Sequence, residues 1–346
     1  MAIQDPTLDH PFADIPHEGD VMPVAPGILW VRMPLPFALN HVNVWLLEDE
    51  GGWLAVDAGL NSNRTQEAWR RVFADGLGGR GLSRLLVTHF HPDHMGAAGW
   101  LAGMHGIELH ASLAEWAFAR MLLRETDEDA RTLQRDFYGR CGLAPDLRDA
   151  ISGRGNAYAR GVSPIPPRFE RLRHGDSFHV GGRKWRVITG SGHAPEMLCL
   201  YAEDGRVLIA ADQILPSITP NVSVWPQEPN GDPLADFVAS LERFADLPED
   251  TLVLPSHGRP FRGLHPRRKA LAAHHDDRLA DALAACDHPR SVADIMGVLF
   301  RRDLDVHQSA FAVGETLAHL NRLVRRGDLV RVVDDADVWR FERRRS

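Results

Sequence analysis

The sequence has few of the features that mark secreted or membrane proteins. Its 346 residues include only three cysteines, Cys141, Cys199 and Cys286, and their odd number and wide spacing favour free thiols packed in the core. No apolar run approaches the ~20 residues of a membrane span. The first residues carry neither a basic start nor an apolar stretch, so no signal peptide is expected. These absences predict a cytoplasmic protein that does not interact with membranes.

Net positive charge is lacking too. The chain carries 39 Lys and Arg against 47 Asp and Glu, a formal net charge of −8, whereas binding along a phosphate backbone needs clustered basic residues. A nucleic-acid partner held by the whole surface is therefore disfavoured, although a local basic track stays open. The Gly-x-Ser-x-Gly motif of serine hydrolases is also missing. A hydrolase with this sequence would need another source of its nucleophile.

Histidine, by contrast, is abundant, and several metal-ligand side chains crowd into one stretch. His89, His91, Asp93 and His94 form the pattern H-x-H-x-D-H. Imidazole nitrogens and carboxylate oxygens are ligands that zinc and similar ions prefer. Residues 83–88 predict a buried strand, and residues 95–101 predict the start of a helix. With 18 histidines in the chain a chance grouping is the alternative, but the pattern favours a metal site on a strand-to-helix turn.

Three further candidate ligands follow in the chain. His193, Asp212 and His257 each come just after a short apolar run that predicts a strand. An upstream aspartate, Asp57, ends another such run, Trp-Leu-Ala-Val, at residues 53–56. Because the ends of neighbouring strands meet at one edge of a sheet, these side chains are candidates for the same site.

This ordered set resembles the metallo-β-lactamase superfamily over roughly residues 20 to 285. The resemblance implies an α/β fold, a four-layer αββα sandwich, with two divalent metal ions at one edge, zinc first and iron or manganese as alternatives. It implies that His89, His91 and His193 hold the first metal, that Asp93, His94 and His257 hold the second, that Asp212 bridges both, and that Asp57 orients a ligand imidazole from beneath.

The resemblance also implies hydrolysis by a hydroxide held between the metals, with Asp93 and Asp212 as the catalytic aspartates. The full ligand set, the apolar insertion described next and the negative charge favour an ester-like substrate of small or medium size. A thioester of the acyl-CoA or acyl-glutathione type, or a lactone, is the leading prediction. The alternative is a phosphodiesterase or endoribonuclease acting on single-stranded RNA. A DNA-binding regulator with an inactive metal site is disfavoured, because such a site would be free to lose its ligands.

Residues 113–162 predict a helical, amphipathic insertion. Trp116, Phe137 and Tyr158 are candidates for the wall of a substrate pocket, with packing of the insertion or a dimerisation surface as the alternatives. Asn40 and His41 lie in a loop that borders the metal site in similar proteins, so they are weak candidates for substrate contacts. An ordinary turn is the alternative for these two residues.

The ends of the chain differ in character from its middle. Residues 1–20 predict a loose tail before the main domain of residues 21–286. Residues 291–346 predict a short helix over 291–299, a longer helix over 311–326 and a β-hairpin. This order resembles the winged-helix-like domain found in the branch that includes the β-lactamase-like endoribonuclease. This segment holds 10 Lys and Arg against 9 Asp and Glu, a net charge of 10 − 9 = +1. That balance favours a structural or oligomerisation role over DNA binding, and a homodimer stays open.

Overall fold

The computed structural model describes residues 8–37 and 39–344, and it divides into two compact units. Unit 1 comprises Met1–Arg124, Ala157–Pro220 and Ser240–Arg268, and unit 2 comprises Glu125–Asn156, Asn221–Ala239 and Lys269–Ser346. Residues 1–7 of the predicted tail lie outside the described part. In the remainder of that tail, the backbone of Asp9 exchanges hydrogen bonds of 3.2 and 2.8 Å with Arg262.

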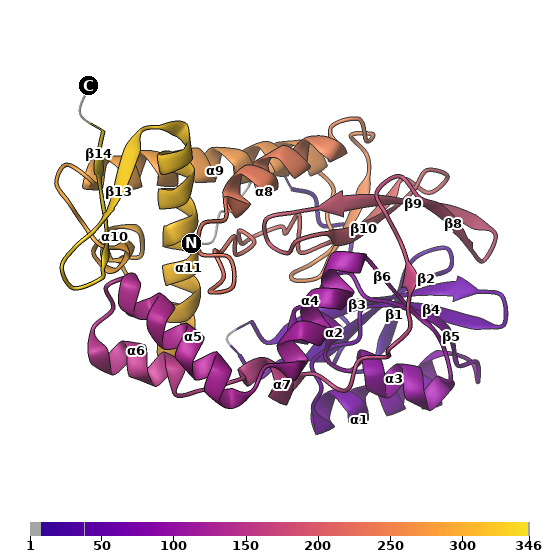
Figure 1. Ribbon diagram of the computed structural model, residues 1–346. Helices are drawn as coiled ribbons and strands as arrows, with labels where there is room; N and C mark the ends of the chain where they lie inside the picture. The colour runs from indigo at the N-terminus through magenta and orange to yellow at the C-terminus, as the bar shows by residue number, and fades with distance from the viewer. Residues whose placement is uncertain (1–7, 38, 345–346) are drawn as a thin grey trace. The chain divides into compact units, whose positions relative to one another are not determined.

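Unit 1 contains a seven-stranded mixed sheet (Figure 1). Its strands pair in chain order, antiparallel from β1 to β4 and parallel from β4 to β7. Strand β4 is buried along its whole length, as expected for an apolar strand covered on both faces. The strands are β1 (Val21–Ala25), β2 (Ile28–Pro34), β3 (His41–Asp49), β4 (Gly52–Val56), β5 (Leu82–Leu86), β6 (Leu109–Ala111) and β7 (Glu170–Arg171).

A second, five-stranded mixed sheet completes the β-structure of unit 1, in the order β12-β11-β10-β9-β8. Apolar side chains of both sheets, among them Trp30, Trp45, Trp185 and Leu254, form one buried cluster. The two sheets therefore pack face to face, as a sandwich requires. The strands are β8 (Ser177–Val180), β9 (Arg183–Gly190), β10 (Met197–Ala202), β11 (Val207–Ala211) and β12 (Leu252–Pro255).

Helices α1 and α3 lie on the outer face of the seven-stranded sheet (Figure 1). Ser62 caps α1, since its hydroxyl accepts the N–H of Thr65 at 3.1 Å. After Arg71 the helix continues as a π-helical turn, η1. The helices that lie wholly within unit 1 are α1 (Asn63–Arg71), η1 (Val72–Gly76), α2 (Pro92–Met95), α3 (Ala98–His105), α4 (Leu113–Arg124), α7 (Ala157–Gly161) and the 3₁₀ turn η2 (Glu242–Phe244).

The segment that follows α7 packs so closely against the start of α3 that the two backbones are in contact. A Cβ atom on Gly99 would meet the carbonyl oxygen of Pro164 at 1.9 Å, so only glycine fits there. Ser163 adds two hydrogen bonds of 2.7 Å to the carbonyl of Gly96, one from its N–H and one from its hydroxyl. The C-terminal end of the predicted insertion is therefore fixed within unit 1.

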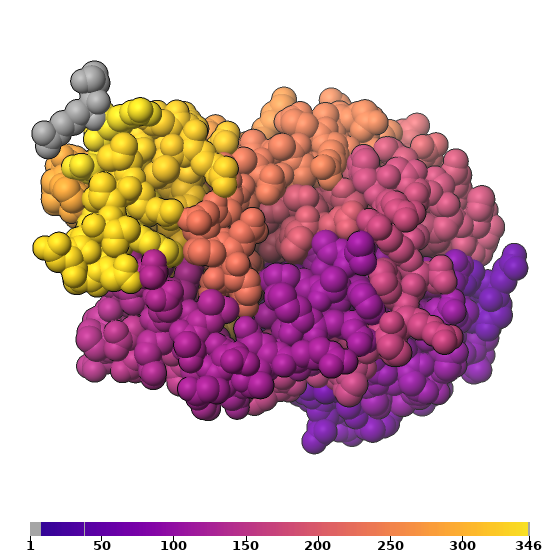
Figure 2. Space-filling view, viewed as in Figure 1, coloured from indigo at the N-terminus to yellow at the C-terminus, as the bar shows by residue number. Residues whose placement is uncertain are grey.

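Unit 2 is mainly helical and ends in a two-stranded hairpin, β13 with β14. The predicted helix of residues 311–326 begins earlier, at Val306, because Asp305 and Gln308 form a capping box in front of it. In Figure 2 the magenta residues of α5 and α6 meet the yellow C-terminal residues in one continuous surface. The elements are α5 (Asp127–Arg140), α6 (Pro145–Ser152), α10 (Val292–Leu299), α11 (Val306–Arg326), β13 (Leu329–Val333) and β14 (Trp339–Arg343), while α8 (Pro233–Leu241) and α9 (Leu264–Ala285) include residues of both units.

Two histidines are buried inside unit 2. Nδ1 of His275 lies 3.3 Å from Nε2 of His319, whose Nδ1 donates to the carbonyl of Glu315 at 2.8 Å. Both side chains are almost fully buried. Burial lowers the pKa of His275 to about 3 and that of His319 to about 4. The pair is therefore neutral at physiological pH.

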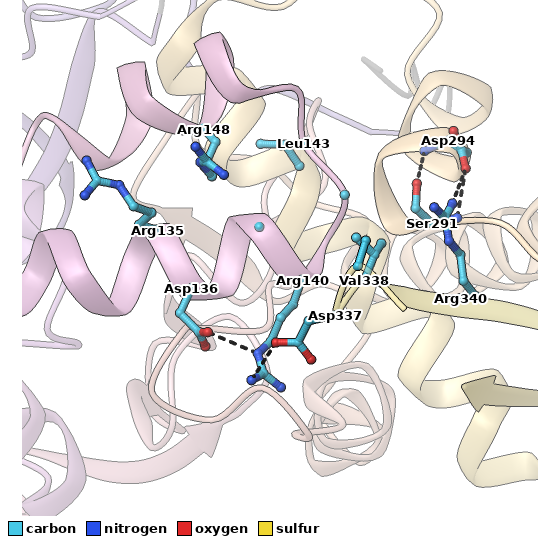
Figure 3. A pocket seen from close by; sticks show the side chains of 13 residues that line it. Arg135, Asp136, Arg140, Leu143, Arg148, Ser291, Asp294, Asp337, Val338 and Arg340 are labelled. Carbon is cyan, nitrogen blue, oxygen red and sulfur yellow. Dashed lines mark hydrogen bonds and ion pairs between the residues drawn. The ribbon is translucent and has the colours of Figure 1, made fainter. Parts of the chain in front are cut away.

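A surface cavity of about 480 Å³ in unit 2 is lined by polar residues. Figure 3 shows two of its arginines paired with carboxylates: Arg140 with Asp136 and Asp337, and Arg340 with Asp294. The other two, Arg135 and Arg148, both pair with Asp149. None of the predicted metal ligands lines this cavity. With its guanidinium groups already paired, it offers no clear preference for a charged ligand.

Candidate metal centre

The seven candidate ligands all lie in unit 1, and each follows the end of a strand. The stretch from His89 to His94 runs from β5 into the short helix α2, whose first position is Pro92. The other three ligands, His193, Asp212 and His257, come just after β9, β11 and β12. The carboxyl ends of strands from both sheets therefore bring together residues that are up to 168 positions apart, from His89 to His257.

The structure places the seven side chains in three overlapping groups. Within each group the candidate ligand atoms lie within 4.8 Å of one another, and no other such group occurs in residues 8–37 and 39–344. The groups are His89 with His91 and His193, His89 with His94 and Asp212, and Asp93 with His94 and His257. The first, called the three-histidine group below, and the last have the same members as the two ligand sets that the resemblance implies.

Asp212 lies between the two ligand sets. Its Oδ2 atom is 3.3 Å from Nε2 of His193 and 3.4 Å from Nε2 of His257, while its Oδ1 atom is 3.6 Å from Nε2 of His94. Nε2 of His94 and Oδ1 of Asp212 are buried and have no hydrogen-bond partner in the described part of the chain. Such atoms are costly to bury unless a cation satisfies them. The donor set of imidazoles and carboxylates therefore fits two divalent ions.

Burial and neighbouring charges determine which of these ligands are neutral. Burial, together with the nearby His193, lowers the pKa of His91 to about 3, so this imidazole is neutral as a ligand must be. Burial alone would lower the pKa of His94, but the carboxylates of Asp57, Asp93 and Asp212 raise it to about 9. Burial alone would raise the pKa of Asp212, but His257 and His94 hold it well below its usual range. The carboxylates of Asp93 and Asp212 are thus ionised, which favours binding of cations at the site.

Asp57 lies next to His94, one of the candidate ligands. Its Oδ2 accepts from Nδ1 of His94 at 2.8 Å, and its Oδ1 accepts the N–H and the hydroxyl of Thr88 at 2.8 and 2.9 Å. Because Asp57 accepts the proton on Nδ1, Nε2 is the atom that would bind a metal ion, which would replace the second proton of this imidazole. The Asp57 backbone has a left-handed φ of 71°, which a hydrogen bond from its N–H to Leu86 holds in place.

His41 and Asn40, the weak candidates for substrate contacts, form hydrogen bonds within the chain, and their contact with a substrate stays a prediction. The carbonyl of His41 accepts from Nδ1 of His257 at 2.8 Å, and its ring Nε2 accepts the N–H of Gly258 at 3.1 Å. Nδ1 of the same ring bonds Oδ1 of Asn40 at 2.8 Å. His41 therefore fixes the tautomer and orientation of His257, a contribution that the sequence did not reveal.

The three aromatic candidates for a pocket wall also contact protein groups. Trp116 donates from Nε1 to the carbonyl of Pro166 at 3.0 Å and stacks on Phe169 with ring centroids 4.5 Å apart. The hydroxyl of Tyr158 donates to the carbonyl of Phe90 at 2.6 Å. Phe137 is 3% exposed in unit 2. These contacts fit packing roles, and a substrate contact for any of the three stays a prediction.

Glu115 is a buried residue near the ligands that sequence reasoning missed. It sits in the first turn of α4 and is 0% exposed. Burial raises its pKa to about 7, despite the backbone N–H groups of Glu196 and Phe90 that it accepts. An acidic residue near the start of a predicted helix is an ordinary feature. Nothing in the sequence indicates that this one is buried beside the ligand loops.

Comparison with known proteins identifies the class. Residues 38–257 match the model of the metallo-β-lactamase superfamily, and residues 279–344 match the metallo-β-lactamase-like C-terminal domain. The chain belongs to the metallo-β-lactamase superfamily and, with its His and Asp cluster, is a metal-dependent hydrolase of that superfamily. Its α/β fold of two mixed sheets, with a helical C-terminal region and a small hairpin, agrees with this membership.

Several individual proteins are similar over most of the chain. A β-lactamase domain protein from Burkholderia ambifaria is 45% identical, with 97% of this chain and 98% of that chain covered and a TM-score of 0.91. A metallo-β-lactamase family protein from Thermus thermophilus is 30% identical, with 92% and 99% covered and a TM-score of 0.79. The acyl-coenzyme A thioesterase MBLAC2 of Gallus gallus is 27% identical, with 69% of this chain and 80% of that protein covered.

Proposed function

We propose that this protein hydrolyses a thioester of the acyl-CoA or acyl-glutathione type, or a lactone, at a centre of two divalent metal ions. The observation that carries the proposal is the position of Asp212, whose carboxylate lies within 3.6 Å of His94, His193 and His257. One carboxylate between two ligand sets suits a pair of ions that share it. The relative named as an acyl-CoA thioesterase supports the thioester as the first substrate to test.

The proposed ligands are those of the sequence analysis. His89, His91 and His193 would hold one ion, and Asp93, His94 and His257 the other, with Asp212 shared. Two divalent ions held in this way, with zinc as the leading candidate, would act as Lewis acids and lower the pKa of bound water from ~16 towards ~7. Asp57 and the carbonyl of His41 orient His94 and His257 by accepting their Nδ1 protons. Asp93 and Asp212, the proposed catalytic aspartates, stay ionised beside them.

We also propose that the two sheets form the centre of a complete four-layer αββα sandwich. Helices α10 and α11 with the β13–β14 hairpin have the element order of a winged helix. Their nearly balanced charge supports a structural or oligomerisation role, including a homodimer, rather than nucleic-acid binding.

The test is a substrate panel on zinc-loaded protein, with the metal content of the same sample measured by elemental analysis. Palmitoyl-CoA, an acyl-glutathione, a lactone and a single-stranded RNA would be compared, each with and without a chelator. We expect two zinc ions per chain and chelator-sensitive turnover of a thioester or lactone. Cleavage of RNA without turnover of any ester would overturn the proposal in favour of a phosphodiesterase.

A further inference from the structure

The two loops that carry the three-histidine group meet at one buried carboxylate. Oε2 of Glu115 accepts the backbone N–H of Phe90 at 2.9 Å, and Oε1 accepts the backbone N–H of Glu196 at 2.6 Å. Phe90 stands between His89 and His91 in the chain, and Glu196 follows three residues after His193. A single side chain therefore connects, through the main chain, the segments that present all three imidazoles.

A second side chain holds the same peptide segment from the other direction. The hydroxyl of Tyr158, in α7, donates to the carbonyl of Phe90 at 2.6 Å. Both the N–H and the C=O of Phe90 are thus bonded to side chains from the predicted insertion, one from α4 and one from α7. With both groups fixed, the peptide planes next to His89 and His91 cannot rotate freely, and the direction of the two imidazoles follows from them.

Capping of α4 does not account for Glu115. The N–H of Glu115 itself is accepted by the Ser112 hydroxyl at 3.2 Å, so a serine serves this end of the helix. The Glu115 oxygens instead accept amides of two other segments. A fully buried carboxylate needs such donors. Here both donors come from the loops of the three-histidine group rather than from the helix.

We infer that Glu115 is a positioning residue for the three-histidine half of the metal centre, with Tyr158 as its support. The inference rests on the proposed assignment of His89, His91 and His193 to one metal ion, and it does not depend on the substrate. Loss of one of the two acceptors should let the ligand loops separate. We expect zinc to bind about 10- to 100-fold more weakly at that half, the range typical for loss of a group that orients a metal ligand.

The experiment measures zinc affinity rather than turnover. Glu115→Gln keeps the size of the side chain but places an NH₂ donor against one of the two backbone N–H groups, so one hydrogen bond is lost. Glu196→Gln is the matched control. It removes a charge of the same kind at nearly the same place, while the backbone N–H that Glu115 accepts is retained. Each full-length protein would be loaded with zinc and titrated with chelators of graded strength, and the zinc ions retained per chain counted.

The expected result is that one zinc ion leaves Glu115→Gln at a chelator strength about 10-fold or more lower than in the wild type, whereas Glu196→Gln behaves as the wild type. Equal chelator curves for wild type and Glu115→Gln would overturn the inference, even if the metal-free variant melts at a lower temperature. Equal weakening in both variants would overturn it too, because local charge would then explain the loss.

Two further outcomes are covered by the same design. If Glu115→Gln fails to fold, Tyr158→Phe becomes the test variant. Removal of its hydroxyl should weaken the binding of the same zinc ion a few-fold. A chelator curve equal to that of the wild type overturns the inference. If the wild type itself does not bind two zinc ions, the proposed metal assignment has failed, which is distinct from wild-type binding of two ions that Glu115→Gln leaves unaltered.

Discussion

Both units contain buried histidines, but the side chains next to these histidines differ. In unit 1 the buried imidazoles of His94, His193 and His257 lie within 3.6 Å of the Asp212 carboxylate. Together with Asp57 and Asp93, this carboxylate raises the pKa of His94 to about 9. In unit 2 the imidazoles of His275 and His319 face each other, and burial lowers both pKa values. Burial alone therefore does not mark a histidine as a metal ligand. The neighbouring carboxylates, which make the first cluster need a cation, are what distinguish it.

The largest expected effect comes from removing the shared carboxylate of unit 1. Asp212→Ala should lower the zinc content at both halves of the centre and reduce turnover by more than about 100-fold. This loss exceeds the range typical for removal of a group that only orients a metal ligand. Elemental analysis and the substrate panel would measure this. His275→Leu in unit 2 is the contrasting variant and should retain the wild-type zinc content. Loss of zinc from His275→Leu would break the distinction between the two kinds of buried histidine.

A second effect should appear in the stability of unit 2. Phe137 packs edge-on against Trp339 with ring centroids 6.1 Å apart, and truncation of a buried aromatic side chain costs about 3–5 kcal/mol. Phe137→Ala should therefore lower the unfolding free energy measured from hydrogen exchange of α11 amides, with the ranking of acyl substrates unchanged. A changed ranking at normal stability would instead support Phe137 as part of a pocket wall.

A third effect concerns pH. Since the folded pKa values of His275 and His319 lie below the ordinary value of about 6.5, the unfolded chain binds protons that the folded chain does not. The stability of unit 2 should fall as pH falls below about 6.5, by up to about 1.4 kcal/mol per pH unit for each histidine.

Hydrogen exchange of α11 amides at pH 5 and pH 7 would measure this slope in the wild type and in the double variant His275→Leu, His319→Met. The double variant is needed because burial raises the pKa of Glu315 to about 7, which contributes a slope of the opposite sign. An equal slope in both proteins would show that the pair does not titrate as described.

The smallest effect should come from a helix cap in unit 2. Ser291 accepts the N–H of Asp294 at 3.2 Å, and Asp294 accepts the N–H of Ser291 at 2.9 Å. Ser291→Ala should cost about 1 kcal/mol, seen as faster exchange in α10 with no change in zinc content. A loss of zinc in this variant would show that the stability of unit 2 affects the metal centre.

The sequence predicted the strands because short apolar runs are local signals, whereas the grouping of ligands up to 168 positions apart came from the resemblance to a known superfamily. Short apolar runs with a polar residue at their ends place His193, Asp212 and His257 after strands, as the structure has them. It misplaced the start of α11, although Asp305 and Gln308 three positions apart were a readable capping signal. Glu115 and Tyr158 could not be found in this way. Their partners lie 25 and 68 positions away from them at Phe90, and a contact of that kind leaves no periodic pattern.

The way in which the predicted insertion is fixed bears on how such a chain can change over evolution or in the laboratory. One end is held through Glu115, and the other through Ser163 and the close approach of Gly99 to Pro164. Between these ends, residues Glu125–Asn156 belong to unit 2. A change in that stretch acts first on the packing of unit 2, where Phe137 contacts Trp339. The attachments of the ligand loops stay in unit 1, so evolution can alter the middle of the insertion separately from the metal centre.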